Sequence, residues 1–104
     1  MQYVVMAEHP PQLCPSSNAQ IRAILKEGVN HIPALAQKLG IEILSLRVFG
    51  PDHIIMSIIE AGDIEAVRSF FLESGLMQWN TINIHATWSL EEALEKIENL
   101  TPIF

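Results

Sequence analysis

The order in which strand-like and helix-like segments alternate constrains the fold of this chain more than any other feature. Runs of β-branched and apolar residues predict four strands, over residues 2–7, 41–49, 53–61 and 80–87. Apolar residues at helical spacing predict three helices, from a cap at Ser16 or Ser17 to Gly40, over 64–74, and from Ser89 to Pro102. The order is therefore strand, helix, strand, strand, helix, strand, helix.

This order is typical of a ferredoxin-like α+β fold, here followed by a C-terminal helix. The crossovers in such folds are right-handed, so we expect both crossover helices on one face of an antiparallel sheet. The expected strand order is 4-1-3-2. A chain of 104 residues predicts a single domain, spanning residues 1–104.

A few residues mark the expected ends of the helices. Gly40 is predicted to end the first helix and Asp63 to cap the second. Ser89 and Glu92 have the spacing of a capping box, in which each side chain accepts a hydrogen bond from the other residue's backbone. Pro33 lacks an N–H group, so it predicts a kink or a brief break in the first helix rather than a domain boundary.

The face of the sheet without helices is expected to need a cover. The strands at 2–7 and 53–61 carry apolar residues at both alternating positions, and 49% of all residues are hydrophobic. Large exposed apolar patches are uncommon on isolated proteins. We therefore expect a homodimer, or a higher even oligomer, in which two open sheet faces pack together.

Composition excludes several classes of partner. The chain has a net charge of −6 and only six Lys and Arg residues, which are dispersed, so nucleic acid and anionic membrane surfaces are not expected partners. No apolar run approaches the roughly 20 residues of a membrane helix, and the first residues lack the pattern of a signal peptide. A single cysteine fits a reducing compartment, so the expected location is the cytoplasm.

Two segments resemble a known group of proteins. Residues 46–71 and 80–89, with the turn Gly50-Pro51-Asp52 and the helix start around Asp63, are similar to dimeric α+β barrel proteins, and above all to small families related to the GYD domain. GYD domains have tyrosine where this chain has Pro51. The resemblance implies a homodimer with a cavity between sheet and helices. That superfamily includes cofactor-free monooxygenases, isomerases, haem enzymes and ligand sensors, so it implies no single function.

The loop after the first strand, residues 8–18, concentrates chemically active side chains. The end of the first strand should lie beside the start of the fourth, which places the loop opposite Gln78, Trp79 and Asn80. The predicted ligand-binding residues here are Glu8, His9, Cys14, Asn18 and Trp79. In the alternative interpretation the prolines of the loop only shape a turn, and Cys14 fills a small apolar gap.

His85 is a second candidate on the fourth strand. Asn83 and His85 alternate with apolar residues, so they are predicted to face the space between two sheets. Tyr3 is expected on that face too, because a buried hydroxyl without a partner costs about 1–3 kcal/mol, and His9 shares its alternation. His9, Asn83 and His85 would then line one polar cavity. Either His9 or His85 could be a general base, and the alternative for His85 is a polar dimer contact.

A transition-metal site is a narrower form of this hypothesis. His9 and Cys14 are of the right type to ligate such a metal, whereas His53 is expected at the opposite end of the sheet, and neither His31 nor His53 is assigned a role. No other cofactor is indicated. The favoured function is a small-ligand-binding or metal-binding homodimer. The alternatives are a small cofactor-free enzyme of the isomerase or monooxygenase type, and an interaction module without a site.

Overall fold

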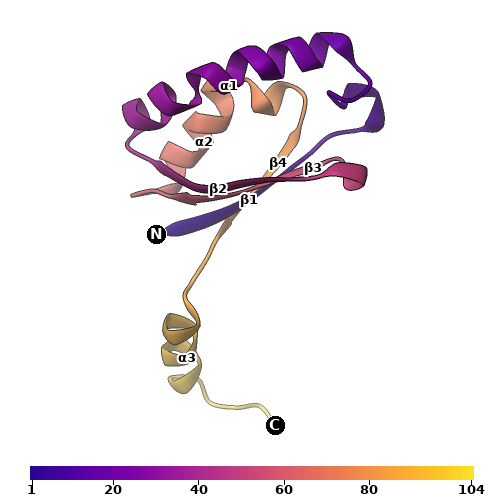
Figure 1. Cartoon of the computed structure of the whole chain (residues 1–104). Helices are drawn as coiled ribbons and strands as arrows, with labels where there is room; N and C mark the ends of the chain where they lie inside the picture. The colour runs from indigo at the N-terminus through magenta and orange to yellow at the C-terminus, as the bar shows by residue number, and fades with distance from the viewer.

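The chain forms an open antiparallel sheet with two helices packed on one face and a third helix projecting away from the other (Figure 1). The computed structural model describes all residues from Met1 to Phe104. The strands are β1 (Gln2–Glu8), β2 (Glu42–Phe49), β3 (Ile54–Glu60) and β4 (Thr81–Ala86), and the helices are α1 (Ala19–Leu39), α2 (Ile64–Glu73) and α3 (Leu90–Glu98). Three single-turn 3₁₀ helices connect them, η1 (Pro11–Leu13), η2 (Gly50–Asp52) and η3 (Leu76–Gln78).

The sheet has the strand order β2-β3-β1-β4, which is the predicted order, and every neighbouring pair is antiparallel. The predicted ferredoxin-like α+β fold with an added C-terminal helix is therefore confirmed. None of the helices combines the length and the apolar character that crossing a bilayer would require.

The helix ends follow the sequence signals, with two exceptions in α1. Gly40 ends α1 in the left-handed region, with φ of 67°, and the Asp63 carboxylate accepts a hydrogen bond from the N–H of Ala66 at 2.9 Å. The capping box of α3 is complete. However, Asn18 caps α1 in place of Ser16 or Ser17, because the Ser17 hydroxyl already donates to backbone carbonyls of the preceding loop.

Pro33 does not break α1, which runs as one continuous helix from Ala19 to Leu39. The apolar stripe on both sides of the proline stays packed against the core, through Ile32, Leu35, Ala36 and Leu39. Proline cannot donate a backbone hydrogen bond, so the helix loses one bond at this position. The packing of the apolar stripe stabilises the helix enough to offset this loss.

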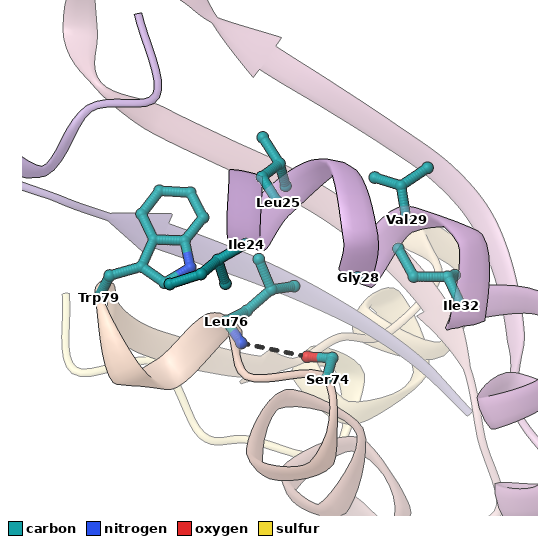
Figure 2. Close-up of a pocket in the computed structure, with 8 residues that line it drawn as sticks. All are labelled: Ile24, Leu25, Gly28, Val29, Ile32, Ser74, Leu76 and Trp79. Carbon is teal, nitrogen blue, oxygen red and sulfur yellow. Dashed lines mark hydrogen bonds between the residues drawn. The ribbon is translucent and has the colours of Figure 1, made fainter. Parts of the chain in front are cut away.

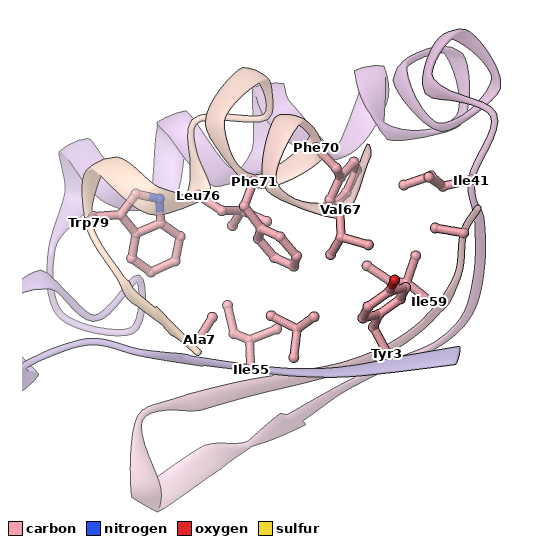
Figure 3. Packing of buried hydrophobic residues seen from close by; sticks show 12 residues of the cluster. Tyr3, Ala7, Ile41, Ile55, Ile59, Val67, Phe70, Phe71, Leu76 and Trp79 are labelled. Carbon is pink, nitrogen blue, oxygen red and sulfur yellow. The ribbon is translucent and has the colours of Figure 1, made fainter. Parts of the chain in front are cut away.

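The hydrophobic core lies between the sheet and helices α1 and α2 (Figure 3). Phe70 and Val67 of α2 meet Val5 and Ile59 of the central strands, and none of these four side chains is exposed. Tyr3 belongs to this core, with 4% of its surface exposed, so its predicted place on the open face is wrong. Its hydroxyl is not among the fully buried atoms without a partner, which removes the energetic argument for turning the ring outward.

The opposite face of the sheet and the third helix both expose apolar side chains. Val4, Met6, Met56 and Ile58 are half-buried on the open face without any helix above them. Helix α3 extends away from the sheet (Figure 1), with its apolar positions exposed, namely Leu90, Leu94 and Ile97. The chain thus has two uncovered apolar surfaces.

Candidate metal centre

The loop after β1 and the turn before β3 bring together two histidines and the only cysteine. His9 follows directly after β1, Cys14 follows η1, and His53 follows η2. One ligand atom from each of these three side chains lies within 4.8 Å of the other two. His9 and Cys14 are buried, and His53 is half-buried. The three elements therefore converge on one cluster, which we call the His9–Cys14–His53 cluster.

The register of β1 with β3 explains why His53 belongs to the cluster. The end of β1 pairs with the start of β3 through Glu8 and Ile54, and the N–H of His9 donates to the carbonyl of His53 at 3.1 Å. The prediction that His53 lies at the other end of the sheet is therefore wrong. The predicted strand order already implied the position of His53. In that order β3 runs antiparallel to β1, as β4 does, so the start of β3 lies beside the end of β1.

His53 adopts a backbone conformation that is unusual for a residue other than glycine. Its φ of 56° and ψ of 41° lie in the left-handed region, and no other non-glycine residue of the chain has a positive φ. Such a conformation is unfavourable for residues with a side chain and is often kept where it serves a function. Here it directs an imidazole toward His9, with the two ring centroids 5.5 Å apart.

Each imidazole in the cluster has one buried nitrogen without a hydrogen-bond partner. These atoms are His9 Nε2 and His53 Nδ1, and they are the only fully buried side-chain nitrogen or oxygen atoms of the chain in this condition. Leaving a buried polar atom unpaired costs about 1–3 kcal/mol, and native proteins satisfy nearly all such atoms. A bound metal cation would give both imidazoles a partner, with the Cys14 thiol as a third ligand.

Asn80 determines which nitrogen of His9 carries the proton. The Asn80 Nδ2 group donates to the carbonyl of Leu76 at 3.0 Å, which turns the Oδ1 atom toward His9 Nδ1 at 2.9 Å. An amide oxygen only accepts hydrogen bonds, so Nδ1 of His9 must be the donor. In the neutral ring the remaining nitrogen, Nε2, holds a lone pair, which is the form that ligates metals.

The thiol of Cys14 is poised to ionise. The side chain and the backbone of Ser16, with smaller contributions from His9 and His53, lower the pKa of Cys14 to about 6. The Cys14 Sγ atom lies 3.0 Å from the Ser16 hydroxyl, whereas the two imidazole nitrogens do not meet hydrogen-bond geometry with the sulfur. Ser16 is therefore the main cause, and a thiolate is the form that binds a metal.

The loop that carries Cys14 is held by a set of hydrogen bonds. The guanidinium of Arg22 donates to the carbonyls of Pro15 and Ser16, both at 2.8 Å. The Asn18 side chain donates to the carbonyl of Gln12 at 3.0 Å and also caps α1 by accepting from the N–H of Ile21. Asn18, a predicted ligand-binding residue, thus shapes the loop and does not line the cluster.

Trp79 anchors the cluster to the helical layer. The indole is 5% exposed and lies 5.1 Å from the His9 ring, centroid to centroid. On its other side, Trp79 lines a small cavity together with Ile24 and Leu25 of α1 (Figure 2). That cavity measures only about 10 Å³, which is at most the room of one water molecule, so it marks a packing contact.

Three of the predicted site residues lie elsewhere. Asn83 and His85 pair with Met6 and Val4 on the open face, whereas His9 contacts Trp79 on the helix-covered side. The prediction of one cavity for His9, Asn83 and His85 is therefore wrong, because it followed from the misplaced Tyr3. Glu8 is exposed and, by strand alternation, turns away from His9.

A pocket opens directly onto the cluster. It has a volume of about 210 Å³ and is lined by the three cluster residues together with Ser16 and the apolar side chains of Pro15, Leu25, Val48 and Ile55. No charged Lys, Arg, Asp or Glu side chain contributes to its wall. At the outer edge Val48 is 69% exposed, so the pocket is accessible from solvent.

No family model matches this chain, and no curated protein sequence matches it.

Proposed function

We propose that this protein binds a transition-metal ion through His9, Cys14 and His53. The single observation that carries the proposal is that ligand atoms of His9, His53 and Cys14 lie within 4.8 Å of one another, while each of the two imidazoles has a buried nitrogen without a hydrogen-bond partner. In a tetrahedral zinc site the ligand atoms lie roughly 3.5 Å apart. The present spacing of up to 4.8 Å is close enough for small side-chain rotations to close the site.

The donor set favours a borderline or soft metal. Two imidazoles and one thiolate suit zinc or copper, whereas magnesium and calcium require oxygen ligands, which the cluster lacks. Zinc sites with three protein ligands keep a fourth position open, as in catalytic sites. The proposal is therefore a Zn²⁺-type site with three protein ligands and one exchangeable position.

Calorimetric titration of the metal-free protein with Zn²⁺ tests this function. One ion per chain should bind, and His9→Ala or His53→Ala should weaken binding by more than about 100-fold, because even groups that only orient a ligand contribute 10–100-fold. His85→Ala is the matched control, since His85 is exposed on the open face. Equal Zn²⁺ affinity in the unmodified protein and in all three variants would refute the site.

We further propose that the protein is a homodimer formed through the open sheet face, as the resemblance to dimeric α+β barrels implies. The support is the apolar set Val4, Met6, Met56 and Ile58 without a helix above it. The exposed stripe of α3 offers a second surface that a partner subunit would cover. A cytoplasmic setting fits both proposals, because a reducing environment keeps the sole cysteine in its thiol form.

A second candidate function is cysteine-dependent catalysis without a metal. The observations that favour it are the hydrogen bond between His9 and Asn80 and a ring nitrogen of His9 within 4.8 Å of the Cys14 sulfur. A nucleophile beside a histidine that a third group orients is a recurring arrangement in covalent catalysis. Here His9 would be the general base. Protein that is active on a thioester or ester after chelation of all metals would favour this function over metal binding.

A further inference from the structure

We infer that the metal site takes a small organic thiol as an external fourth ligand, with the apolar part of that molecule in the adjoining pocket. This inference rests on the proposed metal site and adds its ligand class. It follows from three properties of the pocket, namely its volume, its apolar wall and the charge of the site.

The pocket is placed and sized for a small molecule. All three members of the His9–Cys14–His53 cluster line it, so a molecule in the pocket lies beside the ligand atoms. Its volume of about 210 Å³ lies below the roughly 300–1,000 Å³ of pockets that hold drug-sized ligands. This room suits a compact molecule with a short carbon body and is too small for a peptide or a nucleotide.

The wall of the pocket favours a molecule with an apolar carbon chain and with a metal-binding group that has no further polar atoms. Leu25, Val48 and Ile55 offer apolar contact, and no cationic side chain is present to receive a free anion. Apart from the cluster, the only side chain with a polar group is Ser16, whose hydroxyl already contacts Cys14. A carboxylate would place its second oxygen against this apolar wall without a partner. A thiolate has one donor atom and leaves no polar atom unsatisfied.

The charge of the site points in the same direction. A divalent cation with one cysteine thiolate and two neutral imidazoles carries a net positive charge. A second thiolate neutralises that charge, which favours it in a partly buried apolar setting. Binding breaks the S–H bond, releases one proton to the buffer and forms one metal–sulfur bond, with solvent leaving the fourth position. No electron is transferred, so no oxidant or reductant is needed.

The experiment uses the whole protein loaded with Co²⁺, whose absorption spectrum reports its ligands, and three probes with the same propyl body. Propanethiol should change the visible bands, add intensity to the sulfur-to-cobalt band and release one proton per site. Propanol and butanoate carry no sulfur, so they should leave the sulfur-to-cobalt band without added intensity and should shift the visible bands only at far higher concentration. Absence of cobalt binding before any probe is added would refute the metal site itself. Cobalt binding with no response to propanethiol would refute only the ligand class.

A substitution at the pocket mouth gives the matched control. Val48 is largely exposed and lines the pocket, so Val48→Trp should obstruct the pocket without disturbing the core. We expect it to weaken propanethiol binding by roughly tenfold or more, with cobalt affinity unchanged. Val48→Ala removes one apolar contact of a largely exposed side chain but keeps the pocket open, so it should weaken propanethiol binding far less than Val48→Trp does. If Val48→Trp binds propanethiol as tightly as the unmodified protein, or if propanethiol strips the metal and bleaches the spectrum, the inference is wrong.

Discussion

The Oδ1 atom of Asn80 accepts a hydrogen bond from Nδ1 of His9 at 2.9 Å, and this contact leaves Nε2 of His9 as a buried ring nitrogen without a hydrogen-bond partner. Two loops far apart in sequence are thereby linked. The same asparagine is tied to η3 through its own amide, so the orientation of the imidazole is built into the fold.

Replacing Asn80 with alanine should therefore weaken Zn²⁺ binding without removing a ligand. We expect a loss of about 10–100-fold, because His9 loses the acceptor that fixes its tautomer and orientation. Calorimetric titration measures this loss. Asp63→Ala is the control: it removes the α2 cap and should lower stability by about 1 kcal/mol while leaving zinc affinity unchanged. An Asn80→Ala variant with full zinc affinity would show that Asn80 has only a structural role.

Replacing His53 with glycine should separate stability from metal binding. Glycine adopts the left-handed conformation at little cost, and the substitution also removes an unpaired buried nitrogen. The metal-free protein should unfold at the same or a higher denaturant concentration, with a gain of up to about 1 kcal/mol, while zinc binding is lost. Chemical denaturation of the metal-free form reports the stability. A strong destabilisation would indicate that His53 is a packing residue.

Cys14 should react with iodoacetamide in the native, metal-free protein. Its pKa of about 6 means that the thiolate dominates at neutral pH, so the alkylation rate should level off above pH 6, well below the value for an ordinary cysteine. Ser16→Ala should move this midpoint upward, since Ser16 is the main cause of the lowered pKa. Labelling that requires denaturant would instead indicate an inert core thiol, and bound Zn²⁺ should protect the thiol.

Zinc affinity should fall as the pH is lowered, because protons compete with the metal for the Cys14 thiolate. The metal binds the thiolate, so proton competition at Cys14 is absent above its pKa of about 6 and grows as the pH falls below it. From this thiol alone, affinity should fall about tenfold for each pH unit below that point. The Cys14→Ser variant should lack this contribution. A zinc affinity that is unchanged between pH 7 and pH 5 would contradict thiolate ligation.

The open sheet face should determine the oligomeric state. Light scattering is expected to give about twice the chain mass of 11.6 kDa. Ile58→Lys places a charge on the half-buried open face and should yield a monomer, whereas Leu72→Lys, on the exposed side of α2, should remain dimeric. A monomeric unmodified protein would refute the dimer while leaving the metal site untouched.

Much of the fold could be predicted from the sequence because its signals are local. Gly40, Asp63 and the pair Ser89 and Glu92 each act within one turn of a helix, and the structure places all four at helix ends as predicted. Strand order followed from the sequence of elements. Pro33 is the exception. On local grounds it predicts a kink or a brief break, but α1 is continuous because its apolar stripe stays packed against the core on both sides of the proline.

The site was only partly predictable, because it depends on strand pairing and on the direction of side chains. His9, Cys14 and Trp79 were recognised from the loop composition. His53 was missed although the pairing of Glu8 with Ile54 places it beside His9. The face of β1 was misjudged at Tyr3, since burial of its ring does not require burial of its hydroxyl. The role of Asn80 depends on its contact with Leu76, which no sequence pattern indicates.

The most direct test of the central claim is the absorption spectrum of the protein titrated with Co²⁺. The unmodified protein should show a sulfur-to-cobalt charge-transfer band and intense visible bands of a four-coordinate ion, both saturating at one ion per chain. In Cys14→Ser the charge-transfer band should disappear, while His85→Ala should match the unmodified protein. A spectrum without a sulfur band, or one that Cys14→Ser leaves unchanged, would contradict metal binding by His9, Cys14 and His53.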